Sequence, residues 1–187
     1  MALPLKSDLL GMEFAFQGKP FIDCAGNTTP SLLTMDWSFQ AQPFVTNAVS
    51  GDSTENYTRE PLVALPAGYA DLATEFTAEE YTNVASENNV YVPMGCSDND
   101  YAVFLFKNRM IGFTILNVTW KGKTTTAPAD SSVYLQIYNI TNTAWDTIDS
   151  DTTTLSDTDF TLEASGIAAA AYLDVDNWVS CRVYQVV

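Results

Sequence analysis

The chain has 187 residues, which is enough for one large domain or two small ones. Hydrophobic residues make up 47% of it and charged residues only 17%. This composition is sufficient for a hydrophobic core and argues against an intrinsically disordered chain. Eight basic residues stand against 23 acidic ones. The net charge of −15 argues against binding to nucleic acid, whose phosphates must be neutralised by Lys and Arg.

The first residues do not resemble a secretory signal, because no basic segment precedes an apolar run that Lys6 and Asp8 interrupt. No apolar stretch approaches the roughly 20 residues that span a bilayer, so we expect no membrane partner. We expect a protein made in a cytoplasm, in which its four Asn-x-Thr sequons arise by chance. The odd number and wide spacing of Cys24, Cys96 and Cys181 predict buried thiols and no disulfide framework.

Residues 1–50 contain a short internal repeat. Segments 17–25 and 40–48 share the pattern Gln-x-x-Pro-Phe-(Ile/Val)-x-x-Ala, and residues 32–39 between them alternate as a strand does. Pro before an aromatic and a β-branched residue predicts a turn that leads into an edge strand, since Pro cannot donate to a ladder. We therefore expect an N-terminal arm or hairpin region of short strands.

Residues 51–89 are rich in Gly, Pro and acidic side chains and lack a clean period. They predict an extended connection with a helical turn near Ala78 to Tyr81. Because Tyr, Leu and Phe are scattered through it, we expect this segment to pack against its own domain or a neighbouring subunit.

Short runs of β-branched and aromatic residues occupy residues 90–187. We expect strands at 90–92, 101–106, 111–120, 133–138, 145–148, 159–162 and 178–186. This spacing predicts an all-β fold, an antiparallel β-sandwich of jelly-roll type. Alternation within 133–138 and 178–186 places one face of each strand in the core. Residues 167–173 are Ala-rich, which fits a short helix and a buried loop of small residues equally well.

The chain has no histidine, which removes the commonest general base and a common metal ligand. Neither a phosphate-binding glycine loop nor a dinucleotide fingerprint is present. We therefore expect no enzyme. The remaining catalytic alternative is a hydrolase that uses two carboxylates, since such pairs converge only in the fold.

Acidic residues cluster at Asp146, Asp149 and Asp151, and more acids follow at Asp157 and Asp159. Clustered carboxylates are the ligands that Ca²⁺ prefers, so the first three are candidate metal ligands. The glycine and terminal glutamate of an EF-hand are missing. A solvated turn, in which Asp and Thr cap backbone groups, explains the same residues.

Aromatic residues are frequent in the predicted strands, and Trp145, Tyr138 and Trp178 are candidates for a ligand-binding surface. Aromatic side chains on the outside of a sandwich stack on sugar rings, which makes a carbohydrate-binding module a hypothesis. In the alternative interpretation, the tryptophans fill the core or a subunit interface.

The segments 111–122, 133–139 and 177–185, together with Trp145 and residues 160–162, resemble galactose-binding-like jelly rolls found in minor structural proteins of tailed phages. The Pro-Phe units at 20–21 and 43–44, with Met35-Asp36-Trp37 between them, are similar to short repeats of uncharacterised phage structural proteins. The likeness lies in the strand pattern and transfers no functional residue. It implies a virion protein with an exposed sandwich and an N-terminal arm that holds its neighbours.

Two functional hypotheses follow. The first is a non-enzymatic virion structural protein, a capsid-decoration or tail-associated subunit that forms a homo-oligomer and binds a major capsid or tail protein. The second is a carbohydrate-binding module that uses surface aromatics, with or without Ca²⁺.

Overall fold

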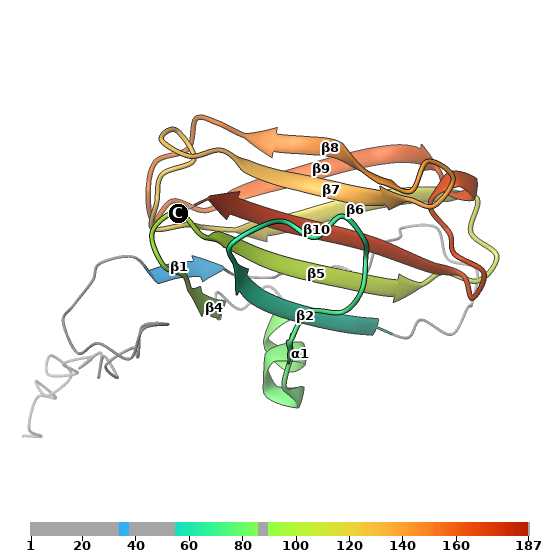
Figure 1. The fold of residues 1–187 in the computed structure, drawn as a ribbon, viewed down its shortest axis with the longest axis horizontal. Helices are drawn as coiled ribbons and strands as arrows, with labels where there is room; N and C mark the ends of the chain where they lie inside the picture. Colours follow the sequence, from blue (N-terminus) through green and yellow to red (C-terminus); the bar gives the residue numbers. More distant parts are fainter. Residues whose placement is uncertain (1–33, 38–54, 86–89, 187) are drawn as a thin grey trace, which may run out of the picture.

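The structure, a computed structural model, describes residues 34–37, 55–85 and 90–186. Within these ranges the chain forms an all-β antiparallel sandwich with one α-helix (Figure 1). The elements in chain order are β1 Thr34–Trp37, β2 Glu55–Leu62, β3 Thr74–Glu75, α1 Ala78–Val84, β4 Val92–Gly95, β5 Tyr101–Arg109, β6 Ile115–Gly122, β7 Val133–Asn139, β8 Ala144–Asp151, β9 Phe160–Ala168, the 3-10 turn η1 Ala169–Ala171 and β10 Trp178–Val186.

Six strands form the main sheet in the order β3-β2-β5-β10-β7-β8. Strands β6 and β9 pair with each other and lie behind this sheet as the second layer, as Figure 1 shows. Strand β1 pairs with β4, which confirms a strand within the expected segment 32–39. The two Pro-Phe segments at 17–25 and 40–48, and Cys24, lie outside the described residues.

The core fills the space between the two layers. Phe104 and Phe106 on β5 and Cys181 on β10 are almost completely buried. From the second layer, the Trp120 indole is 1% exposed and lies 5.3 Å from the Phe160 ring, measured between centroids. Trp120 is therefore a core residue. Cys181 and Cys96 are buried free thiols, as the sequence predicts for them.

Strand β10 lies in the middle of the main sheet, because it pairs with β5 along its whole length and with β7 on its other side. The predicted alternation in β10 holds on its inner face, where Val179 and Val183 are buried. On the outer face, Ser180 and Arg182 are buried as well. The segment between β2 and β3 contacts Arg182 on this face and is described below.

Strand β2 is a correction to the connection expected over 51–89. It pairs with β5 from Glu55 to Leu62. Its sequence is polar and contains Pro61, so it shows no apolar period. Its buried residues are Tyr57 and Thr58, and the Tyr57 ring lies 5.3 Å from that of Phe106 between centroids. Pro61 is tolerated because β3 pairs with β2 only at Thr58 and Arg59.

The helical turn expected near Ala78 is confirmed and extends to Val84 as α1. A capping box starts it: the Thr77 hydroxyl accepts a hydrogen bond from the Glu80 amide at 3.3 Å, and the Glu80 carboxylate accepts one from the Thr77 amide at 2.8 Å. None of the helices in the described ranges is long and apolar enough to cross a membrane.

Several strand boundaries differ from the expected ones; β4, for example, begins at Val92, where the expected strand 90–92 ends. The strand expected from residue 111 begins at Ile115, because residues 111–112 form a turn in which Gly112 has a φ of 81°. The Ala-rich segment 167–173 contains a short 3-10 helix, η1, which partly confirms the helical alternative. Strand β9 continues through Ala168, and η1 follows it.

Candidate functional site

A strap, which we define as residues 63–73, crosses the outer face of the main sheet. Figure 1 shows it passing in front of β10 and β5 between the end of β2 and the start of β3. The Arg182 guanidinium donates a hydrogen bond to the Pro66 carbonyl at 2.7 Å, and the Trp145 indole donates one to the Gly68 carbonyl at 3.3 Å. These bonds hold the strap against β10 and β8.

The structure brings together two of the three aromatic residues that the sequence singled out. Tyr138 on β7 and Trp145 on β8 are cross-strand partners with ring centroids 5.1 Å apart at an angle of 73°. Tyr69 of the strap lies 4.5 Å from Tyr138, which is only 7% exposed. Both predicted residues therefore contact the strap; Tyr138 is buried beneath it, and Trp145 is half-buried.

Arg182 is a buried cation at the centre of this cluster. Its guanidinium lies 4.2 Å from the Trp145 ring centroid and donates a hydrogen bond to the Gln136 side chain at 2.8 Å. In the described part of the chain it forms no ion pair with a carboxylate. Burial lowers the pKa of Arg182 to about 10. Aromatic faces and carbonyl oxygens thus stabilise this charge.

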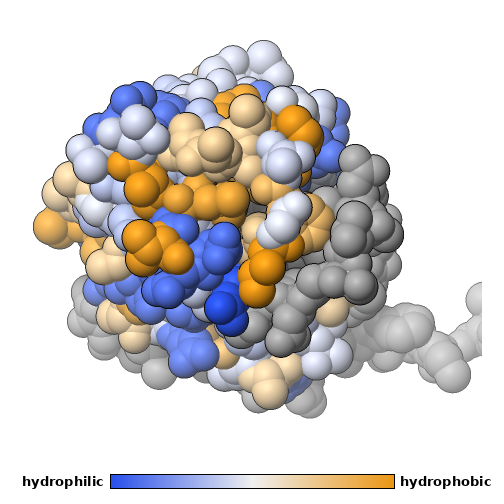
Figure 2. Space-filling model, turned by 90° about the vertical axis from the view of Figure 1, so that its right-hand side faces the viewer, coloured by the Kyte–Doolittle hydropathy of each residue, from blue (hydrophilic) through white to orange (hydrophobic). Residues whose placement is uncertain are grey.

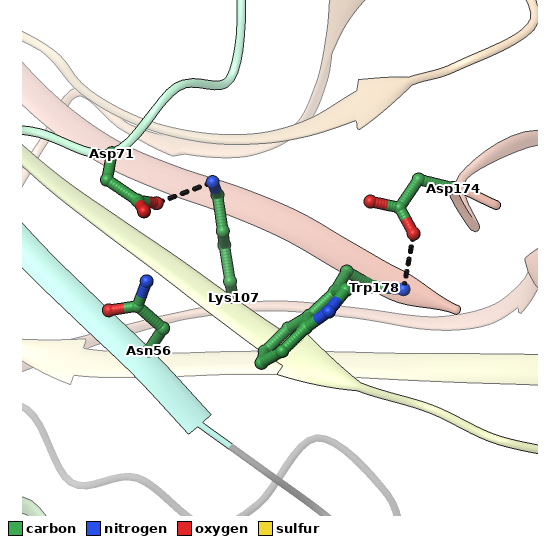
Figure 3. Close-up of a pocket in the computed structure, with 5 residues that line it drawn as sticks. All are labelled: Asn56, Asp71, Lys107, Asp174 and Trp178. Carbon is green, nitrogen blue, oxygen red and sulfur yellow. Dashed lines mark hydrogen bonds and ion pairs between the residues drawn. The ribbon is translucent and has the colours of Figure 1, made fainter. Parts of the chain in front are cut away.

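Trp178, the third predicted residue, lies apart from the other two and lines an open pocket (Figure 3). The pocket has a volume of about 260 Å³, and its lining residues come from β2, the strap, β5, the loop before β10 and β10 itself: Asn56, Asp71, Lys107, Asp174 and Trp178. Sheet register explains part of this convergence, because Asn56 pairs with Lys107 and Trp178 pairs with the neighbouring Arg109.

Two polar contacts organise the pocket. Lys107 forms an ion pair with Asp71 at 2.5 Å, and its ammonium lies 5.4 Å from the Tyr69 ring centroid. One Asp174 oxygen accepts a hydrogen bond from the Trp178 backbone amide at 2.8 Å. Figure 3 shows Asp71, Lys107 and Asn56 on one side of the pocket and Asp174 on the other, with the Trp178 indole between them. An aromatic surface is thus surrounded by hydrogen-bonding groups.

The three candidate metal ligands all lie on β8, but each carboxylate has its own partners. The Asp146 carboxylate accepts hydrogen bonds from the Asn139 side chain at 2.8 Å and from the Tyr172 hydroxyl at 3.2 Å. The Asp149 carboxylate accepts one from the backbone amide of Glu163 on β9 at 2.7 Å.

The Asp151 carboxylate caps the turn that follows β8. It accepts hydrogen bonds from the amides of Thr153 and Thr154, at 2.7 and 3.1 Å, and from both of their hydroxyls. Within the described ranges, no three acidic or cysteine side chains form a group that could hold a metal ion. Ca²⁺ binding by Asp146, Asp149 and Asp151 stays a prediction, and this arrangement adds no support to it.

A row of tyrosines lies on the outer face away from the pocket. Tyr134 and Tyr184 stack at 5.2 Å, and Tyr101 lies 6.0 Å from Tyr184, measured between ring centroids. All three are half-buried. The row follows from the register of β5, β10 and β7, which alternation alone does not reveal.

The residues that sequence reasoning missed are the polar partners of Trp178. Asn56, Asp71 and Lys107 lie in three segments far from Trp178 in sequence, and no spacing signal links them. Only Asp174, four residues before Trp178, is close enough to be considered with it. Comparisons with protein-family models, with curated proteins and with solved structures find no match to the chain.

Proposed function

We propose that the chain is a non-enzymatic virion structural protein, a capsid-decoration or tail-associated subunit that binds neighbouring subunits. The β-sandwich agrees with the fold that the phage resemblance implies. The observation that carries the proposal is an exposed apolar surface at one end of the sandwich. In this proposal the chain assembles as a homo-oligomer onto a major capsid or tail protein and takes no nucleic acid, membrane or catalytic partner.

The end surface, which we define as Ile111, Ile115 and Val175, lies where β5 ends and β6 and β10 begin. Figure 2 faces this end of the molecule and shows apolar residues gathered beside a hydrophilic strip. Ile111 and Ile115 are 44% and 45% exposed, and Val175 is 97% exposed. Grouped apolar side chains with a polar border are typical of protein–protein interfaces.

The net charge of −15 favours a partner with a basic surface. Charge of one sign keeps free subunits soluble and repels similar acidic surfaces. A basic surface on the capsid or tail protein would attract this chain and orient it on approach. The proposal therefore combines apolar contact at the end surface with attraction to a basic partner.

The first experiment measures the oligomeric state of the full chain by light scattering, for the wild type and for Ile115→Asp. We expect a closed oligomer for the wild type and a shift toward monomer for the variant, because a carboxylate in an apolar interface is poorly solvated. Leu155→Asp is the matched control, since Leu155 is 69% exposed and lies in the loop between β8 and β9. A wild-type chain that stays monomeric at high concentration would contradict the proposal.

The second experiment tests the place of the chain in a virus particle. Antibodies against the chain should label the surface of purified particles in electron microscopy, at positions that repeat with the particle's symmetry. Particles that contain no copy of the chain would overturn the virion assignment.

A second candidate function is carbohydrate binding, and the Trp178 pocket favours it. Tyr138 and Trp145 contact the strap, whereas the Trp178 indole lines an open pocket beside an amide and two carboxylates. A glycan array, run with and without a chelator, separates the two functions. A decoration protein should bind no specific sugar, and a carbohydrate-binding module should bind a defined set.

A further inference from the structure

We propose that the Trp178 pocket binds one neutral sugar ring, the terminal residue of a glycan, stacked on the indole and hydrogen-bonded by Asn56, Asp174 and the Asp71–Lys107 pair. The inference rests on the second candidate function, carbohydrate binding, and names its site and ligand class.

The size of the pocket points to a single ring. Pockets for drug-sized ligands span about 300 to 1,000 Å³. The Trp178 pocket, at about 260 Å³, lies just below that range. It is open to solvent, so a glycan chain can continue outward from the bound ring. A terminal residue fits these dimensions better than an internal stretch of polysaccharide.

The polar groups of the pocket match hydroxyl-rich ligands. In the described part of the chain, the Asn56 amide and the Trp178 indole N–H make no hydrogen bond, and the second Asp174 oxygen accepts none. The amide donates and accepts, the indole donates and the carboxylate accepts. Adjacent sugar hydroxyls, which can each donate and accept, satisfy such a mixed set. The indole face supplies the apolar contact for the C–H face of the ring.

Charge selects against anionic sugars. Asp71 and Asp174 bring two negative charges to the pocket and Lys107 one positive charge, so its local sum is −1, and the whole chain carries −15. A sialic acid or a sulfated sugar would meet this negative field. A neutral hexose, deoxyhexose or N-acetylhexosamine would not.

The pocket is also held in place before a ligand arrives. Asn56, Lys107 and Trp178 stand on paired strands of the main sheet. The ion pair to Asp71 fixes Lys107, whose side chain is 14% exposed. Side chains already held in position lose less conformational entropy on binding, which favours binding of a ligand that matches their arrangement.

The test titrates the full chain with methyl glycosides of galactose, glucose, mannose, fucose and N-acetylglucosamine, with sialic acid as the anionic probe. Indole N–H signals in NMR spectra report binding at each tryptophan. We expect one of the neutral glycosides to shift the Trp178 signal in a saturable way and the Trp145 signal much less. Sialic acid should cause no saturable shift.

Two variants locate the site. Trp178→Ala should weaken binding about tenfold or more, as expected when an aromatic anchor is truncated. Asp174→Asn keeps an oxygen that can accept from the Trp178 amide, and should weaken binding while the thermal midpoint changes little. The control is Asp176→Asn, because the exposed Asp176 side chain does not line the pocket. Binding measured by calorimetry should be the same for this control and the wild type.

The outcomes distinguish failure of the carbohydrate-binding function from failure of the pocket assignment. If the array shows glycan binding that Trp178→Ala leaves unchanged, the carbohydrate function stands and the pocket assignment is wrong. If neither the array nor the titration shows binding, both are wrong. Preference for sialic acid would overturn the neutral ligand class. Release of a free sugar from a bound glycoside would show hydrolysis and would overturn simple binding.

Discussion

Asp151 illustrates how one acidic residue of a candidate metal cluster acts within the protein. Burial by itself raises the pKa of its carboxyl, but hydrogen bonds from Thr154 and Thr153 outweigh this and hold the pKa below its usual value. A carboxyl whose pKa is lower in the folded state stabilises the fold at neutral pH. That contribution is lost as the pH falls through the folded-state pKa, below about pH 4.

We therefore expect Asp151→Asn to lower the free energy of unfolding by about 1 to 2 kcal/mol at neutral pH, because charged hydrogen bonds are replaced by neutral ones. Denaturant titrations should show the difference from wild type shrinking as the pH falls below about 4. Asp130→Asn, at an exposed position, is the control. If Ca²⁺ stabilises the wild type and not Asp151→Asn, the metal-ligand interpretation of this cluster would replace the turn interpretation.

The strap is the element that sequence patterns did not reveal. Its amides bond to the sheet at two points: Leu72 donates to the Thr58 hydroxyl at 3.1 Å, and Ala73 donates to the Glu60 carboxylate at 3.1 Å. Tyr69 is its aromatic anchor, between Tyr138 and Lys107. Aromatic pairs of this kind contribute about 0.5 to 1.5 kcal/mol beyond the area they bury.

Tyr69→Ala should loosen the strap without unfolding the sandwich. Hydrogen exchange should accelerate at the Leu72 and Ala73 amides, while the amides of β5 and β10 keep their protection. Val63→Ala, at a strap position that is 83% exposed, should leave all of these rates unchanged. An equal loss of protection in β10 would show that the strap and the sheet unfold together.

At the scale of elements, the predicted strands after residue 90 rest on local alternation and turn residues, and the structure contains a strand in each predicted region. Strand β2 was missed because its stability comes from pairing with β5, whose residues lie 39 to 53 positions later in the chain. The same reason applies to the pocket. Asn56 and Lys107 become neighbours only through this pairing.

At the scale of the whole molecule, buried and half-buried phenols should make the protein sensitive to alkali. Burial is the main cause that raises the pKa values of five tyrosines, and for Tyr91 the value rises to about 12. The others are Tyr57, Tyr81, Tyr172 and Tyr184. In the unfolded chain these phenols ionise near pH 10. Above that pH the folded state binds more protons, so stability falls as the pH rises.

The lowered pKa of Arg182 has the opposite effect on stability. At alkaline pH the unfolded chain keeps the Arg182 proton more fully than the folded chain does, so this group favours folding as the pH rises. The Cys181 thiol, whose pKa burial also raises, acts in the same direction as the five phenols, so six groups oppose Arg182. We therefore expect a net loss of stability between about pH 9 and about pH 11. Denaturant midpoints across this range, followed together with tyrosinate absorbance, measure the effect. A constant midpoint while the phenols ionise would contradict it.

Local features of the chain were enough to determine the all-β sandwich, the inward alternation of β7 and β10 and the absence of histidine chemistry, because each depends on composition or on neighbours a few residues apart. Only the tertiary structure decided what surrounds each of the half-buried tryptophans. Trp145 and Trp178 both occur in predicted strands, yet the strap covers the surroundings of one, and the pairing of β2, β5 and β10 leaves the other in a polar pocket. Strand pairing and the path of a crossing segment are long-range contacts, and no local pattern encodes them.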